Sequence, residues 1–199
     1  MSHALEQIKI AVPQAKAIGY AADVSKPPAV AGLFAFVDRE WGGLDILINN
    51  AGVGIFRPAA DLTVEEWDRM LATNLSGAFY CSKQALARFG QAGGGFIINI
   101  SSLAGKNPFA GGSGYNASKF GMNGFSEAMM LDHRNDNVRV SYIMPGSVAT
   151  EFSGKPAQDI SGWKIAPEDI AEIVLHILCM PGRTLISRVE VRPSRPRKD

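Results

Sequence analysis

Tyr115 and Lys119 stand four residues apart in a segment expected to be helical, so their side chains share one face of the helix, one turn apart. Tyrosine is a poor acid–base catalyst at neutral pH because its unperturbed pKa is about 10. An ammonium group held nearby favours the phenolate and lowers that pKa, which brings the tyrosine toward a range useful for proton exchange. Taken alone, such a pair is also a common feature of a helix surface.

Ser102 and Asn74 strengthen the interpretation of this pair as a catalytic site. Ser102 lies thirteen residues before Tyr115, at the end of a predicted strand, where its hydroxyl can hydrogen-bond a substrate oxygen as charge develops on it. Asn74 lies inside a predicted helix although Asn is a mediocre helix former, and an inward-facing amide there could hold a water molecule against Lys119. A turn serine and an ordinary surface asparagine are the alternatives.

The tetrapeptide Asn49-Asn50-Ala51-Gly52 follows a continuous apolar run, Leu44 to Ile48, which is typical of a parallel strand buried on both faces. Its small residues allow the backbone to approach a ligand closely. Its amides can brace neighbouring strands and contact that ligand. A plain turn is the alternative, although this sequence is an uncommon way to form one.

Strand-like and helix-like segments alternate along the chain. We expect strands at 17–22, 44–48, 96–100, 138–143 and 184–191, and helices at 27–40, 63–89, 113–132 and 167–178. A capping box at Thr63 and Glu66 begins the second of these helices, and Pro167 begins the last. The alternation predicts one α/β domain over residues 1–199, with a doubly wound parallel sheet in a Rossmann-like, three-layer αβα arrangement.

The polar residues of interest follow the predicted strands. Asp23 comes after the first strand, Asn49 after the second, Ser102 after the third, and Pro145 with Gly146 after the fourth. Sheets of this kind bind ligands outside the carboxyl ends of their strands. The sequence therefore predicts one binding site along that edge.

Five motifs, in their order and spacing, resemble the classical short-chain dehydrogenase/reductase family: Ile48-Asn-Asn-Ala-Gly52, Asn74, Asn99-Ile-Ser-Ser102, Tyr115-Asn-Ala-Ser-Lys119 and Pro145-Gly-Ser-Val-Ala-Thr150. The resemblance implies reversible hydride transfer between NAD(P) and a small carbonyl compound or secondary alcohol. It implies that Tyr115 is the catalytic acid/base and that Ser102 orients and polarises the substrate oxygen. Lys119 would bind the nicotinamide ribose and depress the pKa of Tyr115, and Asn74 would complete a water-linked proton relay.

The same resemblance implies where the cofactor binds. Asp23 and the Val24 backbone would contact adenine, and Val148 with Thr150 would hold the nicotinamide end. The implied set is Asp23, Val24, Asn49, Asn50, Ala51, Gly52, Tyr115, Lys119, Pro145, Gly146, Val148 and Thr150. The C-terminal segment 187–193 is similar to a branch that includes NADP-dependent hydroxy-acid and carbonyl reductases, which favours NADP over NAD.

The beginning of the chain departs from the family pattern. The family opens on a strand, a Thr-Gly-x-x-x-Gly-x-Gly turn and a helix that hold the cofactor pyrophosphate, and this sequence contains no such turn. The sheet is therefore expected to lack its first strand–helix–strand unit. That loss would isolate residues 17–22 and leave an apolar, aggregation-prone edge at 44–48.

Three accounts of this departure stay open. The sequence is a piece of a longer enzyme, which we favour; or it is a shortened enzyme in which residues 17–22 pair directly with 44–48. In the third account it is a catalytically impaired relative that cannot hold the cofactor and acts as a binding or scaffold protein. The complete set of Asn74, Ser102, Tyr115 and Lys119 argues against the third account.

Composition is that of an ordinary globular protein, with 46% hydrophobic and 20% charged residues and a formal net charge of +1. This balance argues against a nucleic-acid or membrane-surface partner, and the proline-interrupted basic stretch 193–199 is expected to be a flexible tail. No apolar run could span a bilayer and no signal-peptide pattern is present, so a cytoplasmic location is expected. The two cysteines and three histidines show no ligand spacing, and no metal is expected.

Two further expectations concern the substrate and the assembly. The short, polar segment from Thr150 to Trp163 would close over a small pocket near Phe109 and Phe152, which suits a small substrate. The resemblance implies a dimer interface on the two long helices, so we expect a homodimer or homotetramer. The alternative is that the apolar residues of these helices only pack in the core. These residues are Phe79, Cys81, Phe120, Met122, Phe125, Met129 and Met130.

Overall fold

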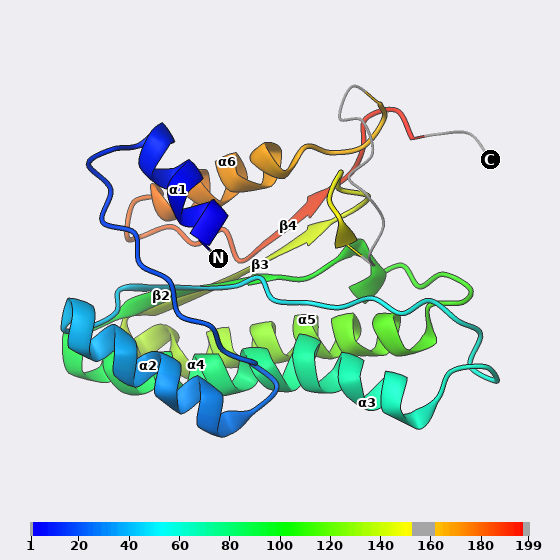
Figure 1. The fold of residues 1–199 in the computed structure, drawn as a ribbon, viewed down its shortest axis with the longest axis horizontal. Helices are drawn as coiled ribbons and strands as arrows, with labels where there is room; N and C mark the ends of the chain where they lie inside the picture. Colours follow the sequence, from blue (N-terminus) through cyan, green and yellow to red (C-terminus); the bar gives the residue numbers. More distant parts are fainter. Residues whose placement is uncertain (1, 153–161, 197–199) are drawn as a thin grey trace.

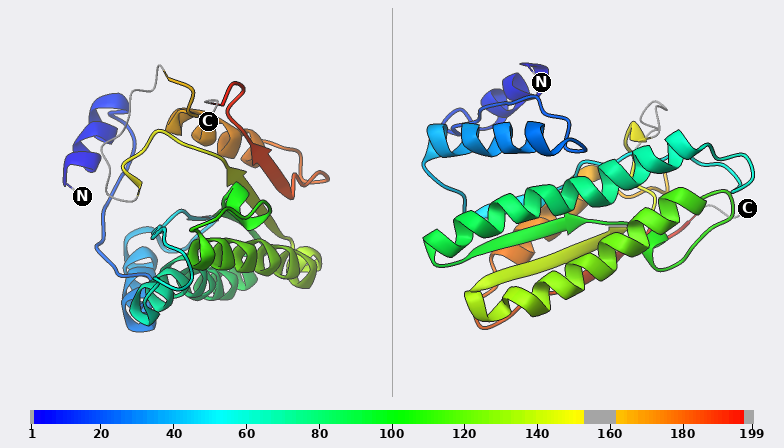
Figure 2. Two further views of the ribbon diagram at one scale, coloured as in Figure 1. Left: turned by 90° about the vertical axis from the view of Figure 1, so that its right-hand side faces the viewer. Right: turned by 90° about the horizontal axis from the view of Figure 1, so that it is seen from below.

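A computed structural model describes residues 2–152 and 162–196 of the chain. Its centre is a four-stranded parallel sheet in the order β1-β2-β3-β4, formed by β1 (Ile46–Asn49), β2 (Gly95–Ile100), β3 (Val138–Pro145) and β4 (Arg188–Val191). Helices α2, α3, α4 and α5 lie on one face of the sheet and α6 on the other (Figures 1 and 2). The predicted doubly wound, three-layer α/β arrangement is confirmed.

The helices agree closely with the sequence pattern. They are α1 (Ser2–Ala11), α2 (Pro27–Trp41), α3 (Val64–Leu71), the π-helical turn η1 (Ala72–Ser76), α4 (Gly77–Ala92), α5 (Ser113–His133) and α6 (Pro167–Leu178), with 3₁₀ turns η2 (Leu103–Gly105) and η3 (Arg134–Asp136). Helix α6 has the predicted bounds, whereas α1 was not predicted. Within the described ranges, no helix combines the length and the apolar character needed to cross a membrane.

The predicted second helix is one rod with a π-helical turn in its middle, because η1 connects α3 directly to α4. Its first turn carries the expected capping box: the Thr63 hydroxyl accepts from the Glu66 amide, and the Glu66 carboxylate accepts from the Thr63 amide, both at 3.2 Å. These bonds satisfy backbone donors that the first turn would otherwise leave unpaired.

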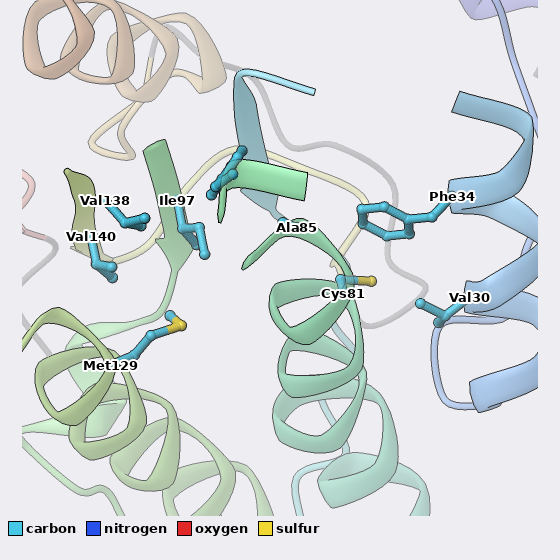
Figure 3. Packing of buried hydrophobic residues seen from close by; sticks show 9 residues of the cluster. Val30, Phe34, Cys81, Ala85, Ile97, Met129, Val138 and Val140 are labelled. Atoms are coloured by element: carbon cyan, nitrogen blue, oxygen red, sulfur yellow. The ribbon is translucent and has the colours of Figure 1, made fainter. Parts of the chain in front are cut away.

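Two hydrophobic cores enclose the sheet because alternate strand residues face opposite layers. On the side of α2, α4 and α5, Ile97 packs with Phe89 of α4 and Met129 of α5, and Val30 and Phe34 point from α2 toward Cys81 (Figure 3). On the side of α6, Phe96 and Ile98 of β2 pack with Val174 and Ile177. Strand β2 is therefore covered on both faces.

Residues 17–22, predicted as the first strand, form no strand. A strand needs a neighbour to satisfy its amide and carbonyl groups, and among the described residues β1 pairs only with β2, so the direct pairing of 17–22 with 44–48 is wrong. As a result β1 is an edge strand, and Ile46 and Ile48 are 42% and 44% exposed on the face toward α6. The predicted apolar edge is confirmed, and the predicted burial of this strand on both faces is wrong.

Two predicted segments fall partly outside the described residues. These are the segment between Thr150 and Trp163, of which 153–161 are not described, and the tail 193–199, of which 197–199 are not described.

Candidate active site

Tyr115 and Lys119 occupy the first turns of α5, beside the carboxyl ends of β1, β2 and β3. Both are buried, with 8% and 4% of their surfaces exposed. The Lys119 Nζ lies 5.9 Å from the centroid of the Tyr115 ring and donates to the Ile100 carbonyl at 2.9 Å. The last carbonyl of β2 therefore fixes the ammonium group beneath the tyrosine.

Ser102 begins the turn η2 directly after β2. Its Oγ accepts a hydrogen bond from the Ala104 amide at 3.1 Å, and its side chain acts on the Tyr115 hydroxyl by lowering the pKa of that group. Gly105 lets this turn lie against α5, since a Cβ there would come within 2.6 Å of the Lys119 carbonyl oxygen. The Asn123 amide also donates to the Gly105 carbonyl at 3.0 Å, so α5 holds the serine at the tyrosine.

Asn74 lies fully buried in the π-helical turn η1. Its Oδ1 accepts from the Val53 amide at 2.8 Å, and its Nδ2 donates to the Val53 carbonyl at 2.9 Å and to Ser118 Oγ at 3.0 Å. Both amide hydrogens are therefore used to fix the segment after β1 onto α5. A Cβ built on Gly52 would lie 3.5 Å from Asn74 Oδ1 and 4.0 Å from Lys119 Nζ, so the bare glycine leaves space beside both groups.

Asn49 braces the sheet. Its Nδ2 donates to Asn99 Oδ1 at 2.8 Å and to Ser82 Oγ at 3.1 Å, and Asn99 Nδ2 donates to Ser126 Oγ at 2.8 Å. This chain of polar groups connects β1 and β2 to α4 and α5 through the core, where Ser82 and Asn99 are fully buried. The amide of Asn49 thus has a structural role that the sequence indicated only as one possibility.

An apolar groove of about 180 Å³ runs between α2, β1 and α4. Val24, Asn49, Asn50 and Ala51 line it together with apolar side chains of α2 and α4. Val24 is held there by Gly77, where a Cβ would lie 2.9 Å from the Val24 side chain. The structure therefore brings Val24 and Asn50, which are distant in sequence, to one cavity.

Asp23 lies at the surface beside this groove. Its Oδ1 accepts from the Ser25 amide at 3.0 Å and the Ser25 hydroxyl at 2.7 Å, and these hydrogen bonds hold the pKa of its carboxyl below the ordinary value. The carboxylate therefore orders the turn before α2.

The predicted residues after β3 lie at the far side of the same edge. The Gly146 amide donates to the Val191 carbonyl of β4 at 2.8 Å, and a Cβ on Gly146 would lie 3.2 Å from Leu103. Beyond it, the backbone at Val148 runs parallel to that at Ile165. Pro145 and Gly146 are thus adjacent to the Ser102 turn, and Thr150 follows on the exposed surface.

The pKa values of the central pair move in the directions that burial dictates. Burial raises the pKa of Tyr115, and the hydrogen bond from Ser102 opposes that rise. Burial also lowers the pKa of Lys119 to about 8. The expected lowering of the tyrosine pKa by the lysine is therefore not found in this structure, where loss of solvation is the largest influence on the tyrosine.

Sequence reasoning missed several residues that shape this site. Ser118 bonds Asn74, Asn123 positions the Ser102 turn, and Phe56 packs edge-on against Tyr115 with ring centroids 5.5 Å apart. The only sequence signal for Phe56 is its place shortly after the small residues that end β1. Across residues 2–152 and 162–196, no three His, Cys, Asp or Glu side chains gather as a metal site.

The residues present fit one portion of a nicotinamide dinucleotide. The space beside Gly52, next to Lys119 and Asn74, and the apolar groove at Asn50 lie along one edge of the sheet, so a ligand with a polar sugar and flat rings finds both kinds of surface. The glycine-rich turns at 93–95, before β2, and at 111–114, at the start of α5, do not join a strand directly to the helix after it, so no residue is assigned to a pyrophosphate.

Comparisons with known proteins agree with this geometry. The family model described as short chain dehydrogenase matches residues 1–161. The sepiapterin reductase of Chlorobaculum tepidum is 36% identical over 173 residues, covering 87% of this chain and 71% of that protein. An NADP-dependent 3-hydroxy acid dehydrogenase of Escherichia coli K12 is 35% identical over 182 residues, covering 86% of this chain and 73% of that protein.

Solved structures share the fold along nearly the whole chain. The alcohol dehydrogenase of the archaeon Thermococcus sibiricus, complexed with 5-hydroxy-NADP, superimposes with a TM-score of 0.87 at 26% identity, covering 100% of this chain and 85% of that one. A metagenomic short-chain oxidoreductase in complex with NADP gives a TM-score of 0.82 at 35% identity, covering 98% and 81%. The chain belongs to the short-chain dehydrogenase/reductase family, whose members include the oxidoreductases it matches.

Proposed function

We propose that this protein is an NADP-dependent oxidoreductase that interconverts a small carbonyl compound and the corresponding alcohol, with Tyr115 as the acid/base. One observation carries the proposal: a buried tyrosine has a lysine ammonium beneath its ring and a strand-end serine whose side chain lowers its pKa. The choice of NADP is supported by the name of the hydroxy acid dehydrogenase and by the NADP-type ligands of the two solved structures.

Each side chain of the tetrad has a separate task in this reaction. In carbonyl reduction the Tyr115 hydroxyl gives its proton to the substrate oxygen, and in alcohol oxidation its phenolate accepts that proton. The Ser102 hydroxyl donates a hydrogen bond to the same oxygen and stabilises the charge that develops there. Because burial raises the tyrosine pKa, Tyr115 holds its proton at neutral pH, which favours reduction.

Lys119 and Asn74 support this proton transfer. The Lys119 ammonium stabilises the phenolate that remains after the proton has left. Asn74 fixes the backbone at Val53 and so keeps the space beside Gly52 in place. Bound NADP would supply or accept the hydride, held by Tyr115 and Lys119 at its ribose and by the groove and strand-end residues Asp23, Val24, Asn49, Asn50, Ala51, Gly52, Pro145, Gly146, Val148 and Thr150.

Replacing Tyr115 by Phe tests the proposal. The ring would keep its packing against Phe56 and lose only the hydroxyl, so we expect kcat to fall by about 10²- to 10⁴-fold while NADPH still binds, weakened only by the lost ribose contact. NADPH-dependent reduction of test ketones gives kcat, and quenching of tryptophan fluorescence gives cofactor binding. Tyr80→Phe, the same change on α4, serves as the control.

Two results would count against the proposal. An active Tyr115→Phe enzyme would remove the tyrosine from the reaction. A wild-type protein that shows no saturable binding of NADPH or NADH would instead support the alternative of an impaired relative that cannot hold the cofactor and acts as a binding or scaffold protein.

We also propose that the protein forms a homo-oligomer through the outer surfaces of α4 and α5. Phe79 and Phe120 on these helices are 44% and 45% exposed, and the ring of Phe79 lies 6.0 Å from that of Phe125. Cys81, Met122 and Met129, also named from the sequence, are buried in the core. Core packing therefore explains why Cys81, Met122 and Met129 are apolar, but it does not explain the exposed rings of Phe79 and Phe120.

A further inference from the structure

Three phenylalanine rings gather around Tyr115 although they come from segments far apart in the sequence. Phe56 follows β1, Phe109 follows the turn after β2, and Phe152 follows β3. Phe56 lies 5.5 Å from the Tyr115 ring and 5.6 Å from Phe109, and Phe152 lies 5.7 Å from Tyr115. All three segments leave the carboxyl edge of the sheet, where Ser102 meets the substrate oxygen in the proposed reaction.

All three rings keep a large part of their surface exposed. Phe56, Phe109 and Phe152 have exposed fractions of 47%, 45% and 39%. Exposed apolar residues scattered singly are ordinary, but three aromatic rings gathered on a buried catalytic side chain form a patch, and such patches mark binding surfaces. We call these three residues the aromatic wall.

Gly54 sets how closely two of the rings approach. A Cβ at this position would lie 2.5 Å from Phe152 and 2.9 Å from Phe56, so the two rings pack against a bare backbone. The backbone of Gly54 is not in the left-handed region, so alanine is compatible with its conformation and would act only by displacing the rings. Gly54 therefore controls the width of the aromatic wall.

Asn116 couples the third ring to the catalytic helix. Its side chain lies next to Tyr115 in sequence, is 8% exposed, and donates from Nδ2 to the Phe109 carbonyl at 3.0 Å. The Gly112 amide donates to the same carbonyl at 3.3 Å. The first turn of α5 thus carries both the acid/base Tyr115 and the residue that anchors Phe109. The position of the aromatic wall relative to the reacting oxygen is therefore fixed by one helix.

Three cations that belong to the same segments or lie beneath Tyr115 already have partners. Arg57 Nε contacts Glu66 at 3.0 Å, Lys106 pairs with Glu190, and Lys119 Nζ donates to the Ile100 carbonyl beneath the tyrosine. A substrate carboxylate placed against the rings would lose its hydration without gaining a cation from these three residues. An aromatic or alkyl substituent would instead bury its apolar surface there.

We infer that the aromatic wall of Phe56, Phe109 and Phe152 selects uncharged carbonyl substrates that carry an aryl or bulky alkyl group, in preference to keto acids. This inference rests on the proposed function and names the substrate class of the same site. It separates this chain from the 3-hydroxy acid dehydrogenases that it resembles in sequence.

Two matched pairs of substrates test the inference, each at saturating NADPH. Methyl phenylglyoxylate and phenylglyoxylate share the phenyl ketone and differ in carrying an ester or a carboxylate, whereas methyl phenylglyoxylate and methyl pyruvate differ in the aryl group. We expect kcat/KM to be at least about 10-fold higher for the aryl ester than for either competitor, as one apolar group in a pocket can provide. Binding of the ester is followed separately by saturation-transfer NMR.

Variants of the aromatic wall identify its contribution. Phe56→Ala and Phe109→Ala should each lower kcat/KM for the aryl ester by about 10-fold more than kcat/KM for methyl pyruvate, mainly through KM, and should weaken the NMR binding signal of the ester. Gly54→Ala should act in the same direction by displacing the rings. Trp41→Ala removes a ring that is 49% exposed at the other end of β1 and serves as the matched control.

Each outcome is decisive. The aromatic wall is not the selector if the enzyme prefers phenylglyoxylate. The same holds if Phe56→Ala and Phe109→Ala lose no more activity than Trp41→Ala. Either result would leave the proposed reaction intact. A wild-type protein that binds NADPH and reduces none of the three compounds or any other ketone would overturn the proposed function itself.

Discussion

At the scale of single residues, the site is governed by how burial acts on Tyr115 and Lys119. Loss of solvation disfavours the charged form of both groups, so it raises the pKa of the tyrosine and lowers that of the lysine. The hydrogen bond from Ser102 acts against the shift of Tyr115, because it stabilises the phenolate. The groups around Tyr115 and Lys119 therefore determine which of these two side chains carries its proton at a given pH.

The pKa of Lys119 predicts a dependence of stability on pH. A lysine whose pKa is about 8 when folded and 10.5 when unfolded is deprotonated by folding between these values, so the unfolded state binds more protons and stability rises with pH. From pH 7 to 9 we expect wild type to gain about 1 kcal/mol in free energy of unfolding relative to Lys119→Met. Urea denaturation at both pH values measures this difference.

The comparison with Lys119→Met isolates the lysine from other groups that titrate nearby. Cys81, whose pKa burial raises to about 11, lowers stability as pH rises above 9, and it does so in both proteins. A wild-type protein whose stability relative to Lys119→Met stays constant from pH 7 to 9 would contradict the lowered lysine pKa.

At the scale of elements, strand β1 is the weak point of the fold. Its outer edge has no partner in the described part of the chain, and Ile46 and Ile48 on it are 42% and 44% exposed. Unpaired, apolar edge strands associate with one another through their backbone groups. The exposed face of β1 therefore predicts self-association on concentration.

Ile46→Lys tests this weakness without touching the groove, because Ile46 does not line it. A lysine on the exposed face of an edge strand opposes association by charge repulsion, so the variant should stay soluble at higher concentration than wild type. Light scattering during concentration is the measurement, with Ile46→Val as the control that keeps the edge apolar. Equal scattering by all three proteins would show that β1 does not drive association.

The elements also show where sequence patterns succeed and fail. The capping box at Thr63 and the proline at Pro167 placed two helix starts correctly, because these signals act within a single turn. Residues 17–22 failed as a strand because strand formation requires a neighbour, which local sequence does not reveal. Helix α1 was missed altogether, and the π-helical turn that buries Asn74 depends on packing against Val53 and Ser118.

The same distinction applies to the candidate site. Tyr115, Lys119 and Ser102 could be named from spacing, because helix periodicity and strand ends fix where such side chains point. Phe56 and Gly54 could not be named, since their roles arise when the segments after three different strands converge. The direction of the tyrosine pKa shift also required the structure, because spacing shows a nearby cation but not how deeply both groups are buried.

At the scale of the whole molecule, the parallel sheet brings distant segments to one edge. The turns after β1, β2 and β3 supply Asn49 to Gly52, Ser102 and Pro145 to Thr150, and α5 supplies Tyr115 and Lys119 from the layer beneath. The polar chain from Ser82 through Asn49 and Asn99 to Ser126 ties these layers together. The hydrogen bonds that hold the site residues in position thus also stabilise the packing of the core.

The exposed faces of α4 and α5 predict the assembly of the molecule. Phe79 and Phe120 should be buried between copies, so a Phe79→Glu, Phe120→Glu protein would place charges in that interface and reduce its mass in solution from a dimer or tetramer to a smaller species. Light scattering coupled to size-exclusion chromatography measures the mass. Leu175→Glu, at a position 55% exposed on α6, should leave it unchanged. A monomeric wild type, or a double variant of unchanged mass, would show that these aromatic residues do not form the interface, and their exposure would then need a different partner.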